Sequence, residues 1–554
     1  MMPADDSFPR LRGARPIPKG RPVDPAAVDE VRAFLGSDTP VRDELIEALH
    51  AIQDTTRCLS ARHIAALAEI MGLAQAEVYE VATFYAHFDV IAEGEAPPPD
   101  LTVRVCDGIA CALAGADSLA RDLPGSLGPG VRVKPAPCVG GCDSAPMAVV
   151  GQNRIGSATA ESVRTAVETG ATTTPVPAYR TLDAYRAGGG YASVEGCRSG
   201  GDREGTIAAI EASGLAGLGG AGFPTGRKLR FLDGTPRPRV VAINADEGEP
   251  GTFKDRHCLE TDPHRVLEGA LISAWAVDAD DVWIYLRDEY PHIRAILTTE
   301  IAALAASGLA RDIRLHLRRG AGAYICGEES AILESLEGKR GLPRNRPPYP
   351  AQAGLFGRPT LIQNVETAWW LPEIIGRGAQ AFRDAGRPRF YSVSGRVAEP
   401  GVKLAPSGVT ARQLIDDHAG GLAAGHTFKG YLPGGASGGI LPAAEADQPL
   451  DFGALDSLGC FVGSAAIVVL SDADALRPVA RNLLIFFAEE SCGQCTPCRL
   501  GCEKMIDLID APTWDRPLIE ELSQAMADAS ICGLGQAAPN PVFCALRFFA
   551  DEVT

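Results

Sequence analysis

Residues 490–499 have the sequence ESCGQCTPCR, which places three cysteines at intervals of two residues. Cys502 follows after three more residues, so the spacing alone is that of a bacterial ferredoxin run. A lone Cys532 stands further along the chain, in the turn ICGLG. Three thiolates at such short intervals wrap one side of a cubane, and a [4Fe-4S] cluster is expected, with zinc as the alternative. By spacing, either Cys502 or Cys532 is the fourth ligand.

A second group of cysteines lies in the first third of the chain. Its spacing is C-x4-C and then C-x3-C, and each pair begins just after a segment that predicts a strand. Four thiolates from two loops make a cage, and this spacing favours a [2Fe-2S] cluster. A zinc site and buried free thiols are the alternatives. The candidate ligands are Cys106, Cys111, Cys138 and Cys142.

Composition narrows the class of protein. The 554 residues suggest about three to four domains, and the 46% hydrophobic and 22% charged residues exclude wholesale disorder. The net charge of −18 argues against a nucleic-acid groove and favours small molecules and protein partners. No apolar run reaches the roughly 18 residues of a membrane span, and the first residues lack the apolar core of a secretory signal. A cytoplasmic location is therefore expected.

The chain divides into an arm followed by five units. The arm is rich in proline and arginine, the next unit has helical spacing of apolar residues, and a small α/β unit follows. A larger α/β unit, a β-grasp-like unit and a helical unit around the last cysteines complete the chain. The expected bounds are 1–24 for the arm, 25–96 for the helical bundle, 97–172 and 182–386 for the α/β units, 387–474 for the β-grasp-like unit and 475–554 for the last unit.

Glycine-rich and acidic loops lie between the two groups of cysteines. The segment GLAGLGGAGFPTGRK contains a GxGxxG pattern, but it follows a helical pattern and not a strand, so the standard dinucleotide context fails. Two further loops, INADEGEPGTFKDR and RRGAGAYICGEES, combine glycines with carboxylates. Backbone N–H groups of such loops can bind phosphate, whereas carboxylates suit ribose hydroxyls and amide donors. Together the three loops favour a cofactor site over a purely structural turn.

These loops, with ESCGQCTPCR and ICGLG, resemble the NADH-binding flavin subunit of respiratory complex I and its relatives in NAD-reducing hydrogenases and formate dehydrogenases. The resemblance covers about 200–554. The first 175 residues resemble the thioredoxin-like [2Fe-2S] subunit of complex I, which has the same C-x4-C and C-x3-C spacing. The chain is similar to a fusion of the two. It most resembles the β (diaphorase) subunit of cytosolic NAD-dependent formate dehydrogenases that contain tungsten or molybdenum.

The resemblance implies a multidomain α/β fold and a set of cofactors. The expected order is a helical bundle, a thioredoxin-like domain, a Rossmann-like FMN/NADH domain, a β-grasp-like (SLBB) domain and a C-terminal helical [4Fe-4S] bundle. The expected cofactors are FMN, NAD(H), one [2Fe-2S] and one [4Fe-4S] cluster. The family pattern assigns the fourth [4Fe-4S] ligand to Cys532 and leaves Cys502 as a packed thiol. The expected cluster ligands are Cys106, Cys111, Cys138, Cys142, Cys492, Cys495, Cys498 and Cys532.

Residues that bind FMN and NAD(H) follow from the resemblance position by position. No side chain is expected to be catalytic, because hydride passes between nicotinamide and flavin. For FMN the residues are Gly217, Gly219, Gly220, Lys228, Asn244, Asp246, Tyr324, Gly327, Glu328 and Asn364; for NAD(H) they are Phe223, Phe231, Glu249, Glu329, Arg346 and Tyr349. Glu247, in the same acidic loop, completes the set of expected cofactor-binding residues. The family commonly has Arg at Leu218, Lys at Arg346 and Asn at Gln363, so the FMN contacts at the first and third positions are expected to differ from those of the family.

The implied function is electron transfer between a partner and NAD. A large catalytic subunit, expected to be a tungsten- or molybdenum-containing formate dehydrogenase α subunit with further iron–sulfur clusters, would supply electrons through [4Fe-4S] to FMN, which reduces NAD+. The alternatives are a NADH-oxidising subunit of complex I or of an NAD-reducing hydrogenase, and a non-enzymatic iron–sulfur relay scaffold without flavin. Nucleic acid and a membrane span are not expected. Several isolated residues have structural explanations: Cys326 as a packed thiol, and His87, His257 and His264 as hydrogen-bonding groups.

Overall fold

The computed structural model describes residues 20–36, 39–311 and 313–553. The chain separates into two units. The first consists of the residues up to Phe84 together with Phe88–Pro97, and the second consists of Tyr85–His87 and Pro98–Thr554. Most of the basic N-terminal arm, including Arg10 and Arg15, lies outside the described residues. In the part of the chain that is described, no helix combines the length and the apolar character needed to span a bilayer.

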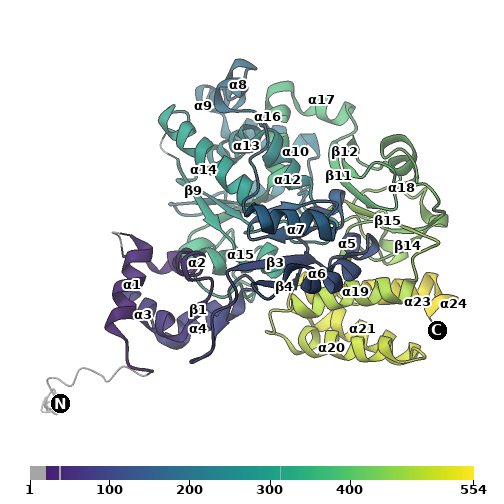
Figure 1. Ribbon diagram of the computed structural model, residues 1–554. Coiled ribbons are helices and arrows are strands. Elements are labelled where there is room, and N and C mark those ends of the chain that lie inside the picture. Colours follow the sequence, from purple (N-terminus) through teal and green to yellow (C-terminus); the bar gives the residue numbers. More distant parts are fainter. Residues whose placement is uncertain (1–19, 37–38, 312, 554) are drawn as a thin grey trace, which may run out of the picture. The chain divides into compact units, whose positions relative to one another are not determined.

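The first unit is a helical bundle, coloured purple in Figure 1. Asp24 caps its first helix by accepting a hydrogen bond from the N–H of Ala26, and Ser60 caps the third helix in the same way. Apolar residues at helical spacing, such as Leu45, Leu49 and Ile52, are fully buried and drive the helices together. Its elements are α1 (Pro25–Leu35), α2 (Leu45–Thr56), α3 (Ala61–Met71) and α4 (Gln75–Phe84), with a short parallel pair of β1 (Leu59–Ser60) and β2 (Val90–Ile91).

The second unit begins with a four-stranded mixed sheet in the order β4-β3-β5-β6. β3 pairs in parallel with β4 and antiparallel with β5. Cys106 ends β3 and Cys138 follows β4, so the two cysteine pairs leave adjacent strands at the same edge of the sheet. The elements are β3 (Leu101–Cys106), α5 (Ile109–Leu113), α6 (Ala116–Leu127), β4 (Val131–Ala136), β5 (Ala148–Val150), β6 (Asn153–Ile155) and α7 (Ala160–Thr169).

A four-stranded parallel sheet, in the order β10-β7-β8-β9, forms the centre of the second unit. Every residue of β8 is buried, which is typical of a parallel sheet with helices on both faces. The strands are β7 (Val240–Ala245), β8 (Asp281–Leu286), β9 (Arg314–Arg319) and β10 (Thr360–Asn364). The helices are α8 (Leu182–Ala187), α9 (Ala192–Gly200), α10 (Arg203–Ser213), α11 (Thr225–Arg230), α12 (Lys254–Thr261), α13 (Pro263–Ala276), α14 (Pro291–Ala306), α15 (Ala331–Leu336), α16 (Val365–Arg377) and α17 (Ala379–Asp384).

A five-stranded sheet follows in the order β12-β11-β15-β13-β14. The long chain between β11 and β15 returns the chain to the centre of the sheet, where these two strands pair in parallel. The other neighbours pair antiparallel. The elements are β11 (Pro388–Gly395), β12 (Gly401–Pro406), α18 (Ala411–Gln413), β13 (Phe428–Leu432), β14 (Leu441–Pro442) and β15 (Ala466–Ser471).

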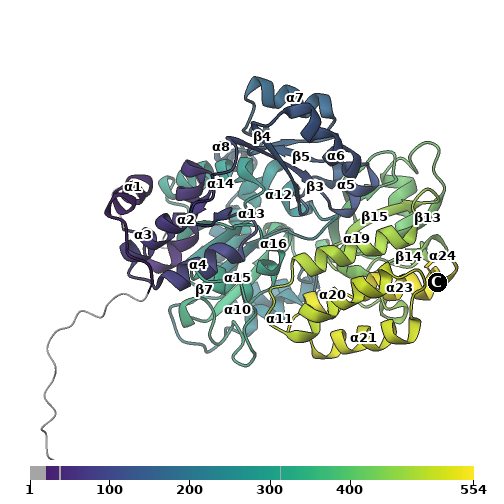
Figure 2. The ribbon, with the colours of Figure 1, turned by 60° about the horizontal axis from the view of Figure 1, so that its bottom comes forward.

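The chain ends in a helical bundle, which lies in the yellow-green part of Figure 2. The helix α20 packs between α19 and α21, and α23 packs against α19. Fully buried Leu483, Phe487 and Met505 form part of the core of this bundle. Its helices are α19 (Leu476–Glu489), α20 (Thr496–Asp510), α21 (Arg516–Ala529), α22 (Gly533–Ala537), α23 (Asn540–Phe548) and α24 (Ala550–Val553).

Candidate functional site

A cavity of about 1000 Å³ opens at the carboxyl end of the parallel sheet. Its walls come from the glycine-rich loop between α10 and α11, from the loops after β7 and β9, and from the end of β10. Every residue that the sequence predicts to bind cofactor lines this one cavity: Gly217, Gly219, Gly220, Phe223, Lys228, Phe231, Asn244, Asp246, Glu247, Glu249, Tyr324, Gly327, Glu328, Glu329, Arg346, Tyr349 and Asn364.

Strand register explains why these distant segments meet. β7 and β10 are parallel neighbours, and Asn244 stands opposite Asn364 where both strands end. Ligands of open parallel sheets bind at this carboxyl edge. The side-chain amide of Asn244 donates to the carbonyl of Gly327 over 2.9 Å, and the side-chain oxygen of Asn364 caps α16 by accepting from the N–H of Glu366 over 3.0 Å. The two asparagines therefore fix the loops of the cavity.

Three polar atoms of the cavity residues are buried and have no hydrogen-bond partner among the described residues. They are the hydroxyl of Thr225, one carboxyl oxygen of Asp246 and the side-chain nitrogen of Gln363. Buried polar groups are normally satisfied, so these atoms fit a ligand that offers both donors and acceptors. A Cβ on Gly219 would lie 3.1 Å from the Cβ of Asn364, so glycine at this position lets the backbone approach the end of β10. An isoalloxazine ring with a ribityl phosphate has the matching donors and acceptors.

Charged side chains face one another across one wall of the cavity. Arg346 pairs with the carboxylates of Glu328 and Glu329, and its distance to Glu329 is 2.8 Å. Lys228 lies 3.6 Å from the other oxygen of Glu329. Burial lowers the pKa of Lys228, while the charge of Glu329 acts in the opposite direction. The second oxygen of Glu328 accepts from the N–H groups of Ser330 and Ala331, as a helix cap does.

Glu249 joins the cavity to the β-grasp-like unit. One of its oxygens accepts from the N–H of Ser437 over 2.8 Å and from the Ser437 hydroxyl over 2.6 Å. The other oxygen accepts from the hydroxyl of Tyr324 over 2.9 Å. Burial raises the pKa of Glu249, and the hydrogen bonds from Ser437 and Tyr324 oppose that shift. The carboxylate is thus held in place from two separate units.

Glu247 turns its carboxylate toward the protein. It accepts hydrogen bonds from the N–H of Asp255 at 2.7 Å, the N–H of Arg256 at 3.0 Å and the hydroxyl of Tyr290 at 3.0 Å. Burial, together with the charge of Asp255, raises its pKa to about 7. Burial also raises the pKa of Asp246 well above its usual range. Burial of these carboxyl groups in the loop after β7 therefore costs free energy.

The mouth of the cavity is aromatic. Phe223, Phe231 and Tyr349 are 37%, 53% and 53% exposed, which is uncommon for side chains of this size. The rings of Phe223 and Phe231 have centroids 5.5 Å apart. Exposed aromatic faces beside a polar cavity suit the stacking of a planar base.

Several cavity residues were not predicted from the sequence. Lys254 is 1% exposed and forms ion pairs with Asp255 at 2.8 Å and Glu366 at 3.0 Å. Nothing in the surrounding segment TFKDR distinguishes a buried lysine from a surface one. Further additions come from the parallel-sheet unit itself, among them Thr225 and Gln363. Others come from later units of the chain, and local patterns give no signal for them: Ser437, Phe461, Gly463, Ser464, Gly533, Leu534 and Ala537.

The thiols of the first cysteine group converge. All four are at most 4% exposed, and the sulfurs of Cys138 and Cys142 are 3.5 Å apart. Cys106 is within hydrogen-bonding reach of both Cys111 and Cys138. Hydrogen bonds from Cys106 and Cys142, with the charge of Arg287, hold the pKa of Cys138 well below its usual range. Four sulfurs in one buried cluster fit the thiolate ligand set of a [2Fe-2S] centre.

Arginines of the parallel-sheet unit hold the loop of Cys138. Arg287 donates to the carbonyl of Cys138 over 2.5 Å, and Arg256 donates to the carbonyl of Gly140 over 2.6 Å. Gly140 has a φ of +68°, and a Cβ there would clash with the hydroxyl of Tyr290. The site of the [2Fe-2S] ligands is therefore packed directly against the cofactor-binding unit.

The second cysteine group combines a loop, a helix start and a remote turn. Cys492 and Cys495 are half-buried, and Cys498 lies in the first turn of α20. Cys532 immediately precedes α22, and burial with the nearby charge of Cys492 raises its pKa to about 11, opposed by hydrogen bonds from the N–H groups of Gly535 and Leu534. Cys502 is fully buried one helical turn after Cys498, and its hydrogen bond lowers the pKa of Cys498 to about 7. Cys532 thus lies near Cys492, and Cys502 contacts Cys498.

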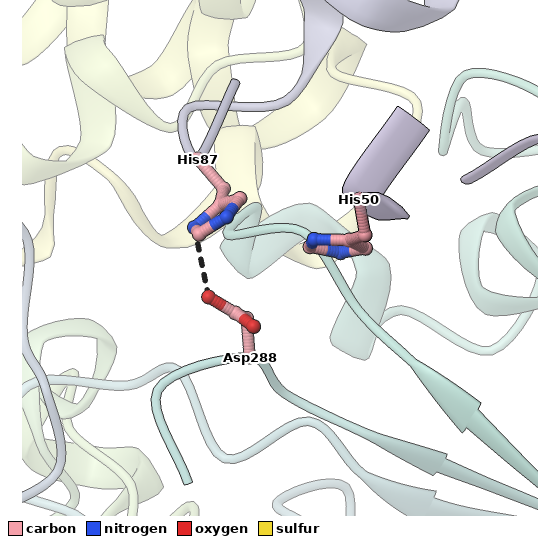
Figure 3. A group of neighbouring side chains, drawn as sticks. All are labelled: His50, His87 and Asp288. Carbon is pink, nitrogen blue, oxygen red and sulfur yellow. Dashed lines mark ion pairs between the residues drawn. The ribbon is translucent and has the colours of Figure 1, made fainter. Parts of the chain in front are cut away.

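The remaining singled-out residues differ in their surroundings. Leu218 is 4% exposed within the core and does not line the cavity, whereas Gln363 does. Cys326 is fully buried, and burial raises its pKa. His264 lies between the hydroxyl of Tyr191 and Glu300 in a buried network. His87 Nδ1 lies 2.8 Å from a carboxyl oxygen of Asp288, as Figure 3 shows. His87 also lies close to His50, so the expectation that it is isolated is wrong.

Three family models match the chain. The Nuo51 FMN-binding domain matches residues 210–373, the thioredoxin-like [2Fe-2S] ferredoxin matches residues 32–171, and the NADH-ubiquinone oxidoreductase-F iron-sulfur binding region matches residues 478–554. The three matches fall on the cavity and on the two groups of cysteines, so sequence comparison and geometry locate the same sites.

Curated proteins and solved structures match longer stretches of the chain than the family models do. The chain is 40% identical over 399 residues to an F-type subunit of the NADH-quinone oxidoreductase of Rhizobium meliloti (strain 1021), a match that covers 68% of this chain and 94% of that protein. It is 39% identical over 395 residues to the F-type subunit of the NADH-quinone oxidoreductase of Aquifex aeolicus (strain VF5), covering 68% and 91%. A crystal structure of NAD+-reducing [NiFe]-hydrogenase in the H2-reduced state matches with a TM-score of 0.81 and 31% identity, over 92% of this chain and 93% of that one.

Fold, cavity and cysteine clusters define a flavin- and iron–sulfur-containing oxidoreductase subunit. The chain belongs to the NADH-quinone oxidoreductase-F family, and a thioredoxin-like [2Fe-2S] region precedes the part that it shares with the curated relatives. The expected multidomain α/β fold is confirmed, as are the cofactors FMN, NAD(H), [2Fe-2S] and [4Fe-4S]. The expectation of an NAD(H)-linked diaphorase-like subunit is confirmed at that level.

Proposed function

We propose that this chain is the diaphorase subunit of a cytoplasmic NAD-dependent formate dehydrogenase. Electrons from a partner catalytic subunit would enter through the [4Fe-4S] site, pass to the flavin cavity and reduce NAD+ to NADH, reversibly. The observation that supports this route of electrons inside the chain is the position of Gly533. It lines the cavity and directly follows Cys532, so a cluster held by Cys532 adjoins the cofactor.

The cavity residues have distinct roles in this proposal. When bound, FMN supplies the link between two-electron hydride chemistry and one-electron transfer. Lys228 places a positive charge beside the cavity, which favours a reduced, anionic ring. Glu249 and Glu329 orient the nucleotide by accepting hydrogen bonds from ribose hydroxyls, and a carboxylate there repels a 2′-phosphate, so NAD is preferred over NADP. Phe223, Phe231 and Tyr349 stack on the adenine half.

The eight cluster ligands are part of the same proposal. Cys106, Cys111, Cys138 and Cys142 hold the [2Fe-2S] cluster, and their mutual sulfur contacts support this set. Cys492, Cys495, Cys498 and Cys532 hold the [4Fe-4S] cluster, which the packing of α22 against α20 supports.

The choice of formate as the ultimate substrate rests on family likeness. The resemblance of the chain to a formate dehydrogenase β subunit favours a tungsten- or molybdenum-containing α subunit as partner. A second candidate is the NAD-linked subunit of a hydrogenase. The likeness to the solved NAD+-reducing [NiFe]-hydrogenase over 92% of this chain supports that alternative.

Purification of the native complex separates the two candidates. We expect a large subunit to copurify, tungsten or molybdenum to be present, and NAD+ to be reduced by formate. Nickel in the complex with NAD+ reduction by H2, and none by formate, would replace the first candidate by the second. NADH-driven reduction of an artificial acceptor tests the diaphorase activity that both candidates share.

A further inference from the structure

Two buried cysteines outside both cluster cages lie against each other. Cys460, in the loop before β15, and Cys544, in α23, have sulfurs 3.5 Å apart. They are 2% and 0% exposed. The two residues are 84 positions apart in sequence and come from different units, so this contact joins the β-grasp-like unit to the cluster-binding bundle.

The backbone of Gly439 passes directly over this thiol pair. A Cβ on Gly439 would lie 2.7 Å from the sulfur of Cys460 and 2.9 Å from that of Cys544, and its φ of +84° is itself a conformation that favours glycine. The N–H of the next residue, Ile440, donates to both sulfurs. A movement of either sulfur is therefore expected to displace the backbone of this turn.

The same turn holds a cavity residue. Ser437 lies two residues before Gly439 and donates to Glu249 through both its N–H and its hydroxyl, at 2.8 and 2.6 Å. The carbonyl of Ser437 accepts from the side chain of Asn540, in the helix that contains Cys544, over 2.9 Å. The thiol pair and the Glu249 carboxylate are thus connected through one short turn and one helix.

We propose that Cys460 and Cys544 form a reversible disulfide that weakens the hold of Ser437 on Glu249 and so lowers the affinity of the cavity for NAD(H). The disulfide requires the sulfurs to close from 3.5 Å to about 2.0 Å, and the turn at Gly439 has to shift with them. The effect on NAD(H) rests on the proposed role of Glu249 in nucleotide binding, whereas formation of the disulfide does not.

Hydrogen peroxide is the oxidant of this step. One thiolate attacks a peroxide oxygen, the O–O bond breaks, and a sulfenic acid and water form after protonation. The second thiol then displaces the hydroxyl group as water, and the S–S bond forms. In sum two thiols lose two protons and two electrons, and one peroxide becomes two waters. A dithiol reverses the step by thiol–disulfide exchange.

The surroundings favour a thiolate in this pair, because one thiol donates to the other sulfur and the N–H of Ile440 donates to both. The hydrogen bond from Cys460, followed by those from the turn and by the charge of Arg547, lowers the pKa of Cys544, whereas the same contact raises the pKa of Cys460. A thiol pair in which one pKa is lowered is suited to forming a disulfide, because the thiolate is the nucleophile.

The test uses the purified holoprotein, treated with hydrogen peroxide, then unfolded, alkylated and digested. We expect one peptide pair joined through positions 460 and 544, restored to two free thiols by dithiothreitol. The buried single thiols Cys258 and Cys326 serve as internal controls and remain open to alkylation after unfolding. Separate alkylation of Cys460 and Cys544 after treatment, at peroxide doses that already damage the clusters, would overturn the proposal.

Kinetics test the link to the cavity. Peroxide treatment should raise the KM for NADH about tenfold in the wild type, as for the loss of one hydrogen bond to a carboxylate, and should leave KM unchanged in Cys460→Ser and in Cys544→Ser. The two variants have the same clusters, so cluster damage cancels in the comparison, and flavin content reports on folding. A cross-link without a rise in KM, in a protein where Glu249→Gln does raise KM, would refute the coupling. An unchanged KM in Glu249→Gln would instead refute the nucleotide contact and leave the disulfide standing.

Discussion

Gly535 lies so close to Cys498 that a Cβ on Gly535 would stand 2.7 Å from the Cβ of Cys498. This contact fixes the start of α22 on the first turn of α20. Cys532, which immediately precedes α22, is thereby held beside the cysteines of the CGQCTPC loop, although 34 positions separate it from Cys498. Close packing at Gly535 therefore brings Cys532 near residues from which it is distant in sequence.

The first prediction concerns the fourth ligand of the [4Fe-4S] cluster. Cys532→Ser should abolish or convert the cluster and cut electron flow to the partner, while NADH still reduces the flavin. Cys502→Ser should leave the cluster signal in place, because Cys502 lies within α20 as a buried donor to Cys498. Electron paramagnetic resonance of the reduced variants distinguishes the two. Loss of the signal in Cys502→Ser and not in Cys532→Ser would make the local ferredoxin spacing the correct interpretation.

A second prediction concerns nucleotide binding. Glu249→Gln should raise the KM for NADH while FMN stays bound, because it removes a charged acceptor worth roughly 1–3 kcal/mol. Glu520→Gln, in an exposed ion pair with Arg516, is the control and should have no effect. Steady-state kinetics with NADH and flavin absorbance give the two readouts. Release of FMN at an unchanged KM would assign Glu249 to the flavin.

The third prediction is a dependence of stability on pH. The pKa of Glu247 is raised from 4.5 to about 7, so the folded state binds this proton more tightly than the unfolded state does. Its contribution to stability is fully present below about pH 4.5 and is lost as pH rises through about 7, by on the order of 3 kcal/mol. Glu247→Gln cannot titrate and should lose less stability over that range. The melting temperatures of wild type and variant at about pH 5, 6, 7 and 8 measure this.

In that experiment the quantity to compare is the change of melting temperature with pH, and not the melting temperature itself. A glutamine at 247 also changes the hydrogen bonds with Asp255 and Tyr290, which shifts all temperatures together. Equal slopes in wild type and Glu247→Gln would show that Glu247 does not titrate in this window.

A fourth prediction concerns metal content. The holoprotein should contain iron and acid-labile sulfide at both cysteine groups, and Cys138→Ser should lose only the [2Fe-2S] signal. The reason is that Cys138 is at the centre of the first sulfur cluster, whereas the second cluster has its own ligands. Stoichiometric zinc with little iron would reverse the assignment. Elemental analysis with spectroscopy of both proteins decides.

The local sequence was sufficient to predict features that depend only on neighbouring residues. The cysteine spacing around Cys106 suggests four candidate ligands, and the spacing around Cys492 suggests three but leaves the fourth open between Cys502 and Cys532. The glycine-rich loop after a helix excluded the standard dinucleotide turn, as the helix α10 ahead of it confirms. The helical pattern around Cys502 was visible in the same way. Such features depend on neighbours within a few residues, which a single sequence displays.

The remainder of the cavity depends on contacts between distant segments. The partner of Glu249 is Ser437, 188 residues away, and no periodicity connects them. Lys254 is buried because Asp255 and Glu366 neutralise it, and Glu366 follows a strand that the register of β7 and β10 places there. Leu218 stands where the resemblance implies an arginine, and only the structure places it in the core. Tertiary pairing decides such positions, so they were not predictable from one chain.

The composite wall of the cavity has a consequence for biogenesis. Phe461, Gly463 and Ser464 supply one part of that wall, and Gly533, Leu534 and Ala537 supply another, close to the last described residues. A chain still emerging from the ribosome has an incomplete pocket until these late helices have been made. Because Cys532, the proposed fourth ligand of the [4Fe-4S] cluster, lies in the same short stretch, completion of the pocket and of that cluster site depends on the same segment of the chain. A truncated product therefore lacks both together, and cannot present a finished flavin pocket without the neighbouring cluster.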